Sequence, residues 1–230
     1  IPKVFAFENY VQVFRKMHIL NGFKASLVIT GMTIALIMVI AIPAAYAFSC
    51  LNFYCKKQMY YLVLVSQMFA PVIVIIPLYT MMNKMGLIDS WLSLVLMNTT
   101  FNLAFIVLML KATFDGVPKE VVEAAKIDGA TSLQSFFYIT LPNVKEMILL
   151  NLTTTLIGAF KVFDEVYIMT AGGPGRSSEV MGTLLYRTGF REDAMGYASA
   201  IGAAIFVITF ALSIAQIRMF NMGNEEKEGV

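Results

Sequence analysis

The amino-acid sequence predicts an all-α, polytopic membrane protein, and composition and hydropathy are the two observations that predict it. Of the 230 residues, 58% are hydrophobic and only 14% are charged, and the mean hydropathy is +0.73. A soluble domain carries about 25% charged residues, so this chain must turn apolar surface toward lipid. This composition excludes a soluble enzyme, a disordered tail and a fibrous protein. A net charge of +2, without a basic run, also excludes nucleic-acid binding.

Five stretches are long and apolar enough to span a bilayer, which takes about 20 residues of helix. Each is a continuous apolar run rather than the alternating pattern of a barrel strand, so helices are predicted. Pro71 and Pro77 lie inside the second stretch, where they predict either a static kink or a hinge. The predicted spans lie at about residues 25–48, 60–82, 92–110, 147–169 and 197–220.

The predicted domain organisation follows from these spans: a leader at 1–24, a transmembrane domain at 25–220 and a tail at 221–230, with polar stretches at 111–146 and 170–196 inside the domain. Lys and Arg residues divide almost evenly between the two sides of this topology, so the positive-inside rule does not set its orientation. The sequence has one histidine, and no cluster of His, Cys or carboxylates lines the spans. We therefore expect no metal site and no cofactor in this chain, and a membrane enzyme is disfavoured.

The polar stretch 111–146 predicts two short helices outside the membrane. Pro118–Asp128 favours a helix because proline suits the first helical position, and Gly129 is a natural C-cap. Thr131 and Gln134 have the spacing of a capping box, which predicts the start of the second helix. Pro142 closes the apolar run that follows.

Two interpretations of this helix pair remain open on physical grounds alone. An amphipathic pair can lie on the lipid headgroups or simply connect two spans. Alternatively, it can be a docking element that presents a rigid helix to the groove of a partner, with small residues at Ala124 and Ala125 for close approach.

The same stretch resembles the EAA loop of permease subunits in binding-protein-dependent ABC importers. The match comprises Glu123-Ala124-Ala125, Gly129, Ile139 and Leu141-Pro142 at full spacing. The longer string EAAKIDGATSLQSFFYITLP is similar to the carbohydrate branch of the family, the maltose and multiple-sugar permeases, in which Asp128 and the aromatic Phe136 are typical. Four further segments resemble the maltose and multiple-sugar permeases, at residues 9–10, 44–48, 76–79 and 86–90. The segments 163–164, 172–174 and 196–200 resemble the first permease of the usual pair, whereas the middle of the chain resembles the second.

This resemblance implies a function and a set of partners. The chain would be the permease subunit of an ATP-driven sugar importer in a bacterial or archaeal inner membrane. It would form the translocation path with a second permease, receive a carbohydrate from an extracytoplasmic solute-binding protein, and couple to two ATPase subunits that use ATP and Mg. The EAA loop would be cytoplasmic, and one of the family's usual six spans would be absent from this chain. The residues that the resemblance assigns to ATPase coupling are Glu123, Ala124, Ala125, Asp128, Gly129, Phe136, Ile139, Leu141 and Pro142.

Other functions remain as alternatives. An importer of the same class could carry another solute, such as a polyol or glycerol phosphate. A secondary transporter is the alternative from a different class, and transport independent of ATP would favour it.

Polar side chains within the predicted spans are candidates for the substrate path. Neutral hydrogen-bonding groups at membrane depth suit either a sugar path or helix–helix packing. Lys161 has the spacing for a local ion pair with Asp164 or Glu165, and a role in transport is the alternative. The candidate path residues are Asn98, Asn102, Asn151, Thr154 and Asp164.

Overall fold

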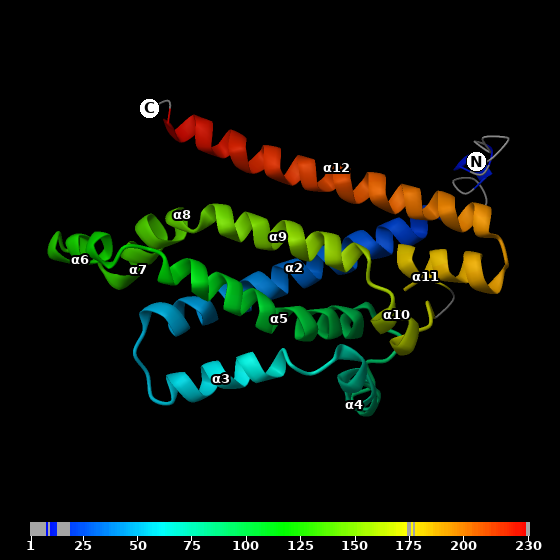
Figure 1. Ribbon diagram of the computed structural model, residues 1–230, viewed down its shortest axis with the longest axis horizontal. Coiled ribbons are helices and arrows are strands. Elements are labelled where there is room, and N and C mark those ends of the chain that lie inside the picture. Colours follow the sequence, from blue (N-terminus) through cyan, green and yellow to red (C-terminus); the bar gives the residue numbers. More distant parts are fainter. Residues whose placement is uncertain (1–7, 9, 13–18, 174–175, 177, 229–230) are drawn as a thin grey trace. The chain divides into compact units, whose positions relative to one another are not determined.

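The computed structural model describes residues 8, 10–12, 19–173, 176 and 178–228, and these residues form helices and turns without a strand. Figure 1 shows the helices in order along the chain. Their bounds are α2 Ile19–Cys50, α3 Lys56–Ser66, α4 Pro71–Lys84, α5 Trp91–Asp115, α6 Lys119–Ile127, α7 Ser132–Ser135, α8 Leu141–Asn143, α9 Lys145–Phe160, α10 Asp164–Met169, α11 Met181–Tyr186 and α12 Met195–Glu228, with π-helices η1 Phe136–Thr140 and η2 Arg187–Arg191.

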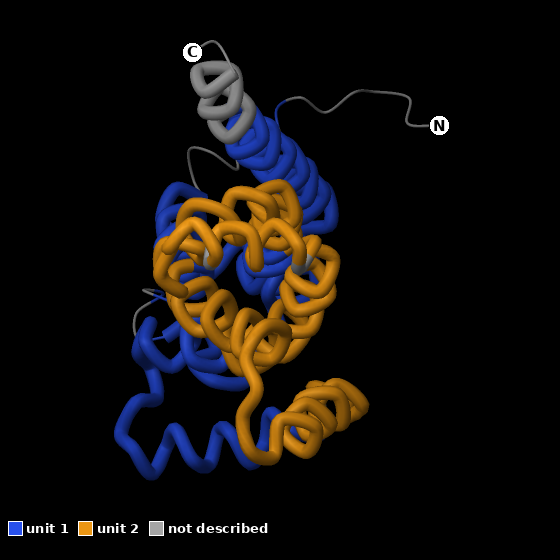
Figure 2. Tube along the Cα trace, turned by 90° about the vertical axis from the view of Figure 1, so that its left-hand side faces the viewer, with its two compact units in different colours: residues 1–34, 72–98, 155–230 blue, residues 35–71, 99–154 orange. Residues whose placement is uncertain are grey.

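Contacts divide the chain into two compact units, coloured separately in Figure 2. Unit 1 comprises residues 1–34, 72–98 and 155–230, and unit 2 comprises residues 35–71 and 99–154.

Three helices among the described residues are long and apolar enough to cross a membrane. They are α2, α5 and the Met195–Arg218 part of α12, and they correspond to the predicted spans 25–48, 92–110 and 197–220. Large apolar side chains on α12 are exposed, among them Phe206 and Phe210. Exposed apolar helix surface of this kind is what lipid or another membrane subunit covers.

The structure breaks the other two predicted spans, 60–82 and 147–169, into shorter helices. Residues 67–70 separate α3 from α4, and Pro71 begins α4 instead of kinking a continuous helix. Residues 161–163 likewise separate α9 from α10. Because proline at a first helical position loses no hydrogen bond, Pro71 is better placed as a helix start than inside a helix. Pro77 remains inside α4.

The core of unit 2 joins three helices. Ile37, Ala41 and Ala45, each four residues apart on α2, are fully buried, which is the spacing of one helix face. They pack with the buried residues Phe48, Ile106, Val107, Leu110, Phe114, Val144 and Ile148.

The core of unit 1 brings the beginning of α2 against α11 and α12. Buried Ile19 packs with Met181, Leu184, Ala200 and Ile201. The backbone N–H of Met181 also donates to Ser26 Oγ at 3.1 Å. These contacts fix the short helix α11 in its unit.

Part of each predicted terminal segment has a helical backbone. Most of the predicted leader, 1–24, lies outside the described residues, but from Ile19 it belongs to α2. The predicted tail, 221–230, continues α12 as far as Glu228. Glu and Lys are good helix formers, so a polar segment that follows a long helix can extend it.

Candidate functional site: a helical docking loop

The first helix of the loop ends as its sequence predicts. The short helix α6 follows Pro118, and Gly129 comes after its last turn with a φ of +88°. The Ala130 N–H donates to the Ala125 carbonyl at 2.9 Å, which is the six-to-one bond of a Schellman motif. Because this left-handed conformation is strained for residues with a Cβ, glycine sets the angle at which the chain leaves α6.

The second helix begins with the predicted capping box. Thr131 Oγ1 accepts from the Gln134 N–H at 3.3 Å, and Gln134 Oε1 accepts from the Thr131 N–H at 2.8 Å. Each side chain therefore satisfies a backbone donor that the first helical turn would leave free. The turn between α6 and α7 is thus held by hydrogen bonds on both sides of Gly129.

The end of the second helix differs from the prediction. Pro142 does not close the run, since it lies in the first turn of α8, and α9 begins at Lys145 after a break at Val144. Between α7 and α8 the backbone forms the π-helix η1. The segment from 132 to 160 is therefore a nearly continuous helical path rather than a separate short helix and a span.

An aromatic cluster ties this path to α2 and α5. The Phe136 ring lies edge-on to Tyr46, with centroids 4.7 Å apart, and 6.5 Å from the Phe114 ring. Tyr46 in turn contacts Phe114 edge-on at 5.9 Å. The resemblance alone assigns Phe136 to coupling. Its ring contacts with Tyr46 and Phe114 are not predicted from the sequence, because no local pattern relates these residues to each other.

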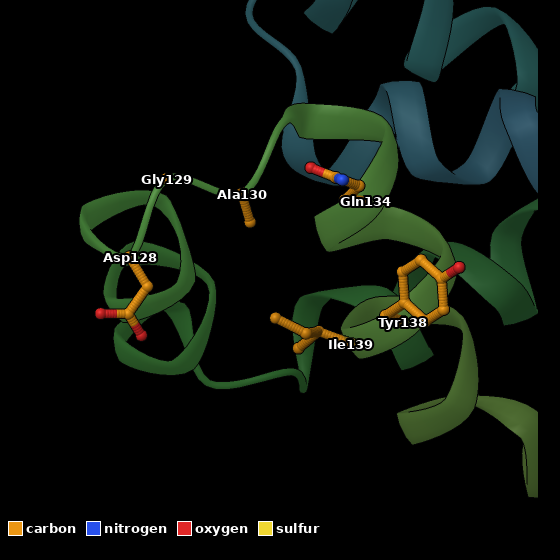
Figure 3. Close-up of a pocket in the computed structure, with 6 residues that line it drawn as sticks. All are labelled: Asp128, Gly129, Ala130, Gln134, Tyr138 and Ile139. Atoms are coloured by element: carbon orange, nitrogen blue, oxygen red, sulfur yellow. The ribbon is translucent and has the colours of Figure 1, made fainter.

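A hollow opens between the end of α6 and η1. It encloses about 320 Å³ and is lined by Asp128, Gly129, Ala130, Gln134, Tyr138 and Ile139. Figure 3 shows the side chains of Ala130 and Ile139 pointing into this space, with Asp128 on the wall formed by α6. The hollow is open to its surroundings, is larger than any one side chain and has both apolar and polar walls. It therefore has room for a short segment of a partner.

The outer surface of the loop combines charge with exposed apolar residues. Glu123 and Ala124 are exposed, and Glu123 forms no ion pair within the described part of the chain. Among the large apolar side chains of the loop, the largest exposed fractions are those of Ile127 at 86%, Tyr138 at 80% and Leu133 at 71%. Such a surface is suited to a protein groove or a lipid surface, the two interpretations left open by the sequence.

Of the remaining residues predicted for coupling, Leu141 is half-buried and packs against the core of unit 2. Ala125 and Ile139 are also half-buried, and Pro142 is exposed. The loop therefore has an inner face, which includes Leu141 and Phe136, and an outer face, which includes Glu123 and Asp128.

The predicted substrate-path residues differ in their surroundings. In unit 2, Asn102 is half-buried on α5, Asn151 is buried on α9 and donates to the Met147 carbonyl at 2.8 Å, and Thr154 is exposed and donates to the Leu150 carbonyl at 2.9 Å. In unit 1, Asn98 is buried on α5 and Asp164 is exposed.

The local ion pair considered for Lys161 does not form. Within the described residues Lys161 pairs with neither Asp164 nor Glu165. Lys161 follows the end of α9, and both carboxylates lie in the first turn of α10. Because the two helices are separate, the spacing that a continuous helix would supply is lost. The two carboxylates instead lie at the positive end of α10.

Comparison with known families decides the class of the protein. Residues 37–219 match the family described as the binding-protein-dependent transport system inner membrane component. The chain belongs to this family. With its long apolar helices, it is a multi-pass membrane protein and a permease component.

Curated relatives and solved structures agree with this assignment. The probable ABC transporter permease protein YurN of Bacillus subtilis is 44% identical over 137 residues, 60% of this chain and 47% of the relative. The arabinooligosaccharides transport system permease protein AraP of Halalkalibacterium halodurans is 39% identical over 112 residues, 48% of this chain and 35% of the relative. The chain thus matches half or less of the length of these two relatives.

The fold is that of solved ABC importers. The structure of a bacterial ABC transporter involved in the import of the acidic polysaccharide alginate matches with a TM-score of 0.74 and 20% identity, over 96% of this chain and 85% of that chain. The alginate transporter in complex with its alginate pentasaccharide-bound periplasmic protein matches with a TM-score of 0.73 and 19% identity, over 94% of this chain and 82% of that chain.

Proposed function

We propose that this permease is the membrane-spanning subunit of an ATP-driven sugar importer. Relatives named for arabinooligosaccharide and multiple-sugar transport support a carbohydrate substrate. The described part of the chain has no group of His, Cys, Asp or Glu side chains that could hold a metal ion. ATP and Mg would be used by two separate ATPase subunits, and a second permease would complete the translocation path.

The proposed topology has five spans in this chain, two of them interrupted helices. Spans at 60–82 and 147–169 would cross as α3 with α4 and as α9 with α10, and interrupted helices are tolerated at membrane depth where protein covers them. The loop 111–146 and the tail 221–230 would be cytoplasmic. The leader 1–24 and the segment 170–196 would be extracytoplasmic, facing a solute-binding protein such as the one bound to the alginate transporter.

The observation that carries the proposal is the construction of the loop. Its angle is fixed by Gly129 and the capping box, its outer face is exposed, and Phe136 links it to Tyr46 and Phe114 in the core of unit 2. A partner that pushes on the outer face therefore moves aromatic rings packed on α2 and α5. In this way closure of an ATPase would be transmitted to helices of the translocation path.

The test is removal of the Glu123 charge. Glu123 is exposed, so Glu123→Gln would remove a charge-assisted contact to the ATPase without disturbing the core. We expect the variant to insert in the membrane, to co-purify with about tenfold less ATPase and to lose most sugar uptake, since a hydrogen bond to a charged group contributes about 1.5–3 kcal/mol.

Glu120→Gln is the matched control, because Glu120 is also exposed and lies in the first turn of the same helix. This control should retain ATPase association and uptake. Equal loss in both variants would indicate a general charge effect on α6, and full association in Glu123→Gln would refute a docking role for Glu123.

A further inference from the structure

A second aromatic cluster lies in unit 1, where α10, α11 and η2 meet. The Phe163 and Tyr167 rings stack at 5.3 Å, and each contacts Tyr186, at 4.9 and 5.3 Å. Phe190 stacks on Tyr186 at 5.4 Å with an interplanar angle of 27°. Although its ring packs on Tyr186, the Phe190 side chain is 66% exposed. The cluster thus presents one rigidly supported ring to its surroundings.

The two arginines of η2 have different roles. Arg187 is neutralised, since Nη1 contacts Glu179 and Nε donates to Glu192 at 3.1 Å. Arg191 has no carboxylate partner within the described residues. Its Nη2 donates to the Tyr167 hydroxyl at 2.8 Å, and its guanidinium carbon lies 5.6 Å from the Tyr167 ring centroid. These contacts orient the Arg191 guanidinium and leave most of its five N–H donors available for a ligand.

The backbone of this site is unusual. Phe190 and Arg191 are neighbours on the π-helix η2, which spans Arg187–Arg191. Well under 1% of residues in globular proteins are in π-helices, and these segments are frequent at functional sites. Thr188 and Gly189 of η2 are buried, whereas Phe190 and Arg191 are exposed. The π-helix therefore exposes an aromatic residue and an arginine at consecutive positions.

We propose that Phe190 and Arg191 form a platform on which a sugar ring stacks during import. An aromatic face suits the C–H face of a sugar, and a few fixed polar groups suit its hydroxyls. Charge on the platform is mixed, because Glu192 and Asp193 are exposed beside Arg191. Mixed charge favours a neutral, hydroxyl-rich ligand, which both donates and accepts, over an anion or a purely apolar one.

This inference rests on the proposed function and adds a substrate contact to it. None of the residues predicted for the substrate path belongs to this platform, and no motif in the sequence indicates it. With 170–196 outside the membrane, the platform would meet the sugar before it enters the spans. It would act on the sugar rather than on the ATPase.

The experiment uses the assembled importer in liposomes, with its binding protein at saturating concentration and labelled arabinotriose or maltotriose as the transported sugar. We expect Phe190→Ala and Arg191→Gln each to lower the uptake rate about two- to tenfold, the range for loss of one aromatic contact. The factor should differ between the two sugars, because their rings and hydroxyls differ. Phe190→Trp should restore uptake by keeping the stacking face.

Phe206→Ala is the matched control, because Phe206 is 67% exposed and stacks on Phe210 at 6.0 Å. It should leave uptake of both sugars unchanged. A readout independent of transport is the indole emission of Phe190→Trp in a Trp91→Phe background, since Trp91 is the only tryptophan among the 230 residues. This emission should change on addition of the transported sugar.

Three results would overturn the platform. Unchanged uptake in Phe190→Ala and Arg191→Gln is the first. The second is a loss that is equal for both sugars and is restored when the binding protein is raised above the concentration that saturates the wild-type importer, since this identifies a protein-docking surface. If the wild-type importer takes up no sugar while ATP hydrolysis is normal, the proposed substrate class fails, and the platform fails with it.

Discussion

Adding a single methyl group to the loop 111–146, the proposed docking loop, should weaken ATPase binding. Gly129 has a φ of +88°, and a Cβ at this position would meet no atom within 4 Å. Gly129→Ala therefore introduces backbone strain without a steric clash. A left-handed conformation costs a residue with a Cβ about 1–2 kcal/mol.

The exposed turn can relieve this strain when it is unbound, because nothing packs against Gly129. Relaxation would change the angle between α6 and α7 and the shape of the hollow lined by Asp128 and Ile139. A partner that recognises the original angle must then restore the strained turn. An added cost of about 1–2 kcal/mol lowers the association constant about 5- to 30-fold.

Gly86→Ala provides a control with the same local chemistry. Gly86 has a φ of +67° and follows α4, where the Leu87 N–H donates to the Met82 carbonyl at 3.0 Å. A methyl group on Gly86 would also meet no atom within 4 Å. The strain is therefore similar, but the site is outside the docking loop. The assay titrates ATPase subunits onto each purified variant and compares dissociation constants with the wild type.

We expect weaker ATPase binding for Gly129→Ala and wild-type binding for Gly86→Ala. Wild-type affinity in Gly129→Ala would refute the argument that the turn sets a docking angle. An equal loss in Gly86→Ala would show that the effect comes from general destabilisation of the permease.

Two further predictions concern topology and the substrate path. In a variant without Cys50 and Cys55, a single cysteine that replaces Ser132 or Asn224 should not react with a membrane-impermeant thiol reagent in intact cells, and should react after permeabilisation. Labelling of either cysteine in intact cells would reverse the proposed orientation. If Asn151 lines the path, Asn151→Ala should reduce uptake of one sugar more than another while ATPase coupling persists, whereas unchanged uptake would assign this side chain to helix packing.

Local sequence signals predict the docking loop well. The sequence predicts a C-cap at Gly129 and a capping box at Thr131 with Gln134, and the structure confirms both. Each signal acts within a few residues, so it needs no knowledge of tertiary packing. The Pro142 prediction is wrong because a proline in the first turn of a helix starts that turn as readily as it ends the preceding one.

Continuity of the helices cannot be predicted in the same way. Hydropathy over about 20 residues reports whether a segment prefers lipid, and it does not report where the backbone breaks. The apolar run from Tyr60 to Met82 contains the break at 67–70, and the run from Met147 to Met169 contains the break at 161–163. The contacts of Phe136 with Tyr46 and Phe114 also escape prediction, because they join residues distant in sequence. The same is true of the contacts that Tyr186, below Phe190, makes with Phe163 and Tyr167.

The π-helix η1 has a consequence for insertions and deletions in this region. A π-turn uses one more residue than an α-turn for about the same rotation, so removing one residue from Phe136–Thr140 would restore a regular α-turn. The residues beyond that deletion would keep nearly their present direction relative to α7, and Leu141 and Ile148 would still face the core. The same deletion inside the regular helix α9 would instead rotate every later residue by about 100° and shift it by about 1.5 Å. The π-helix therefore makes this segment tolerant of a change in length that the regular helices beside it would not accept.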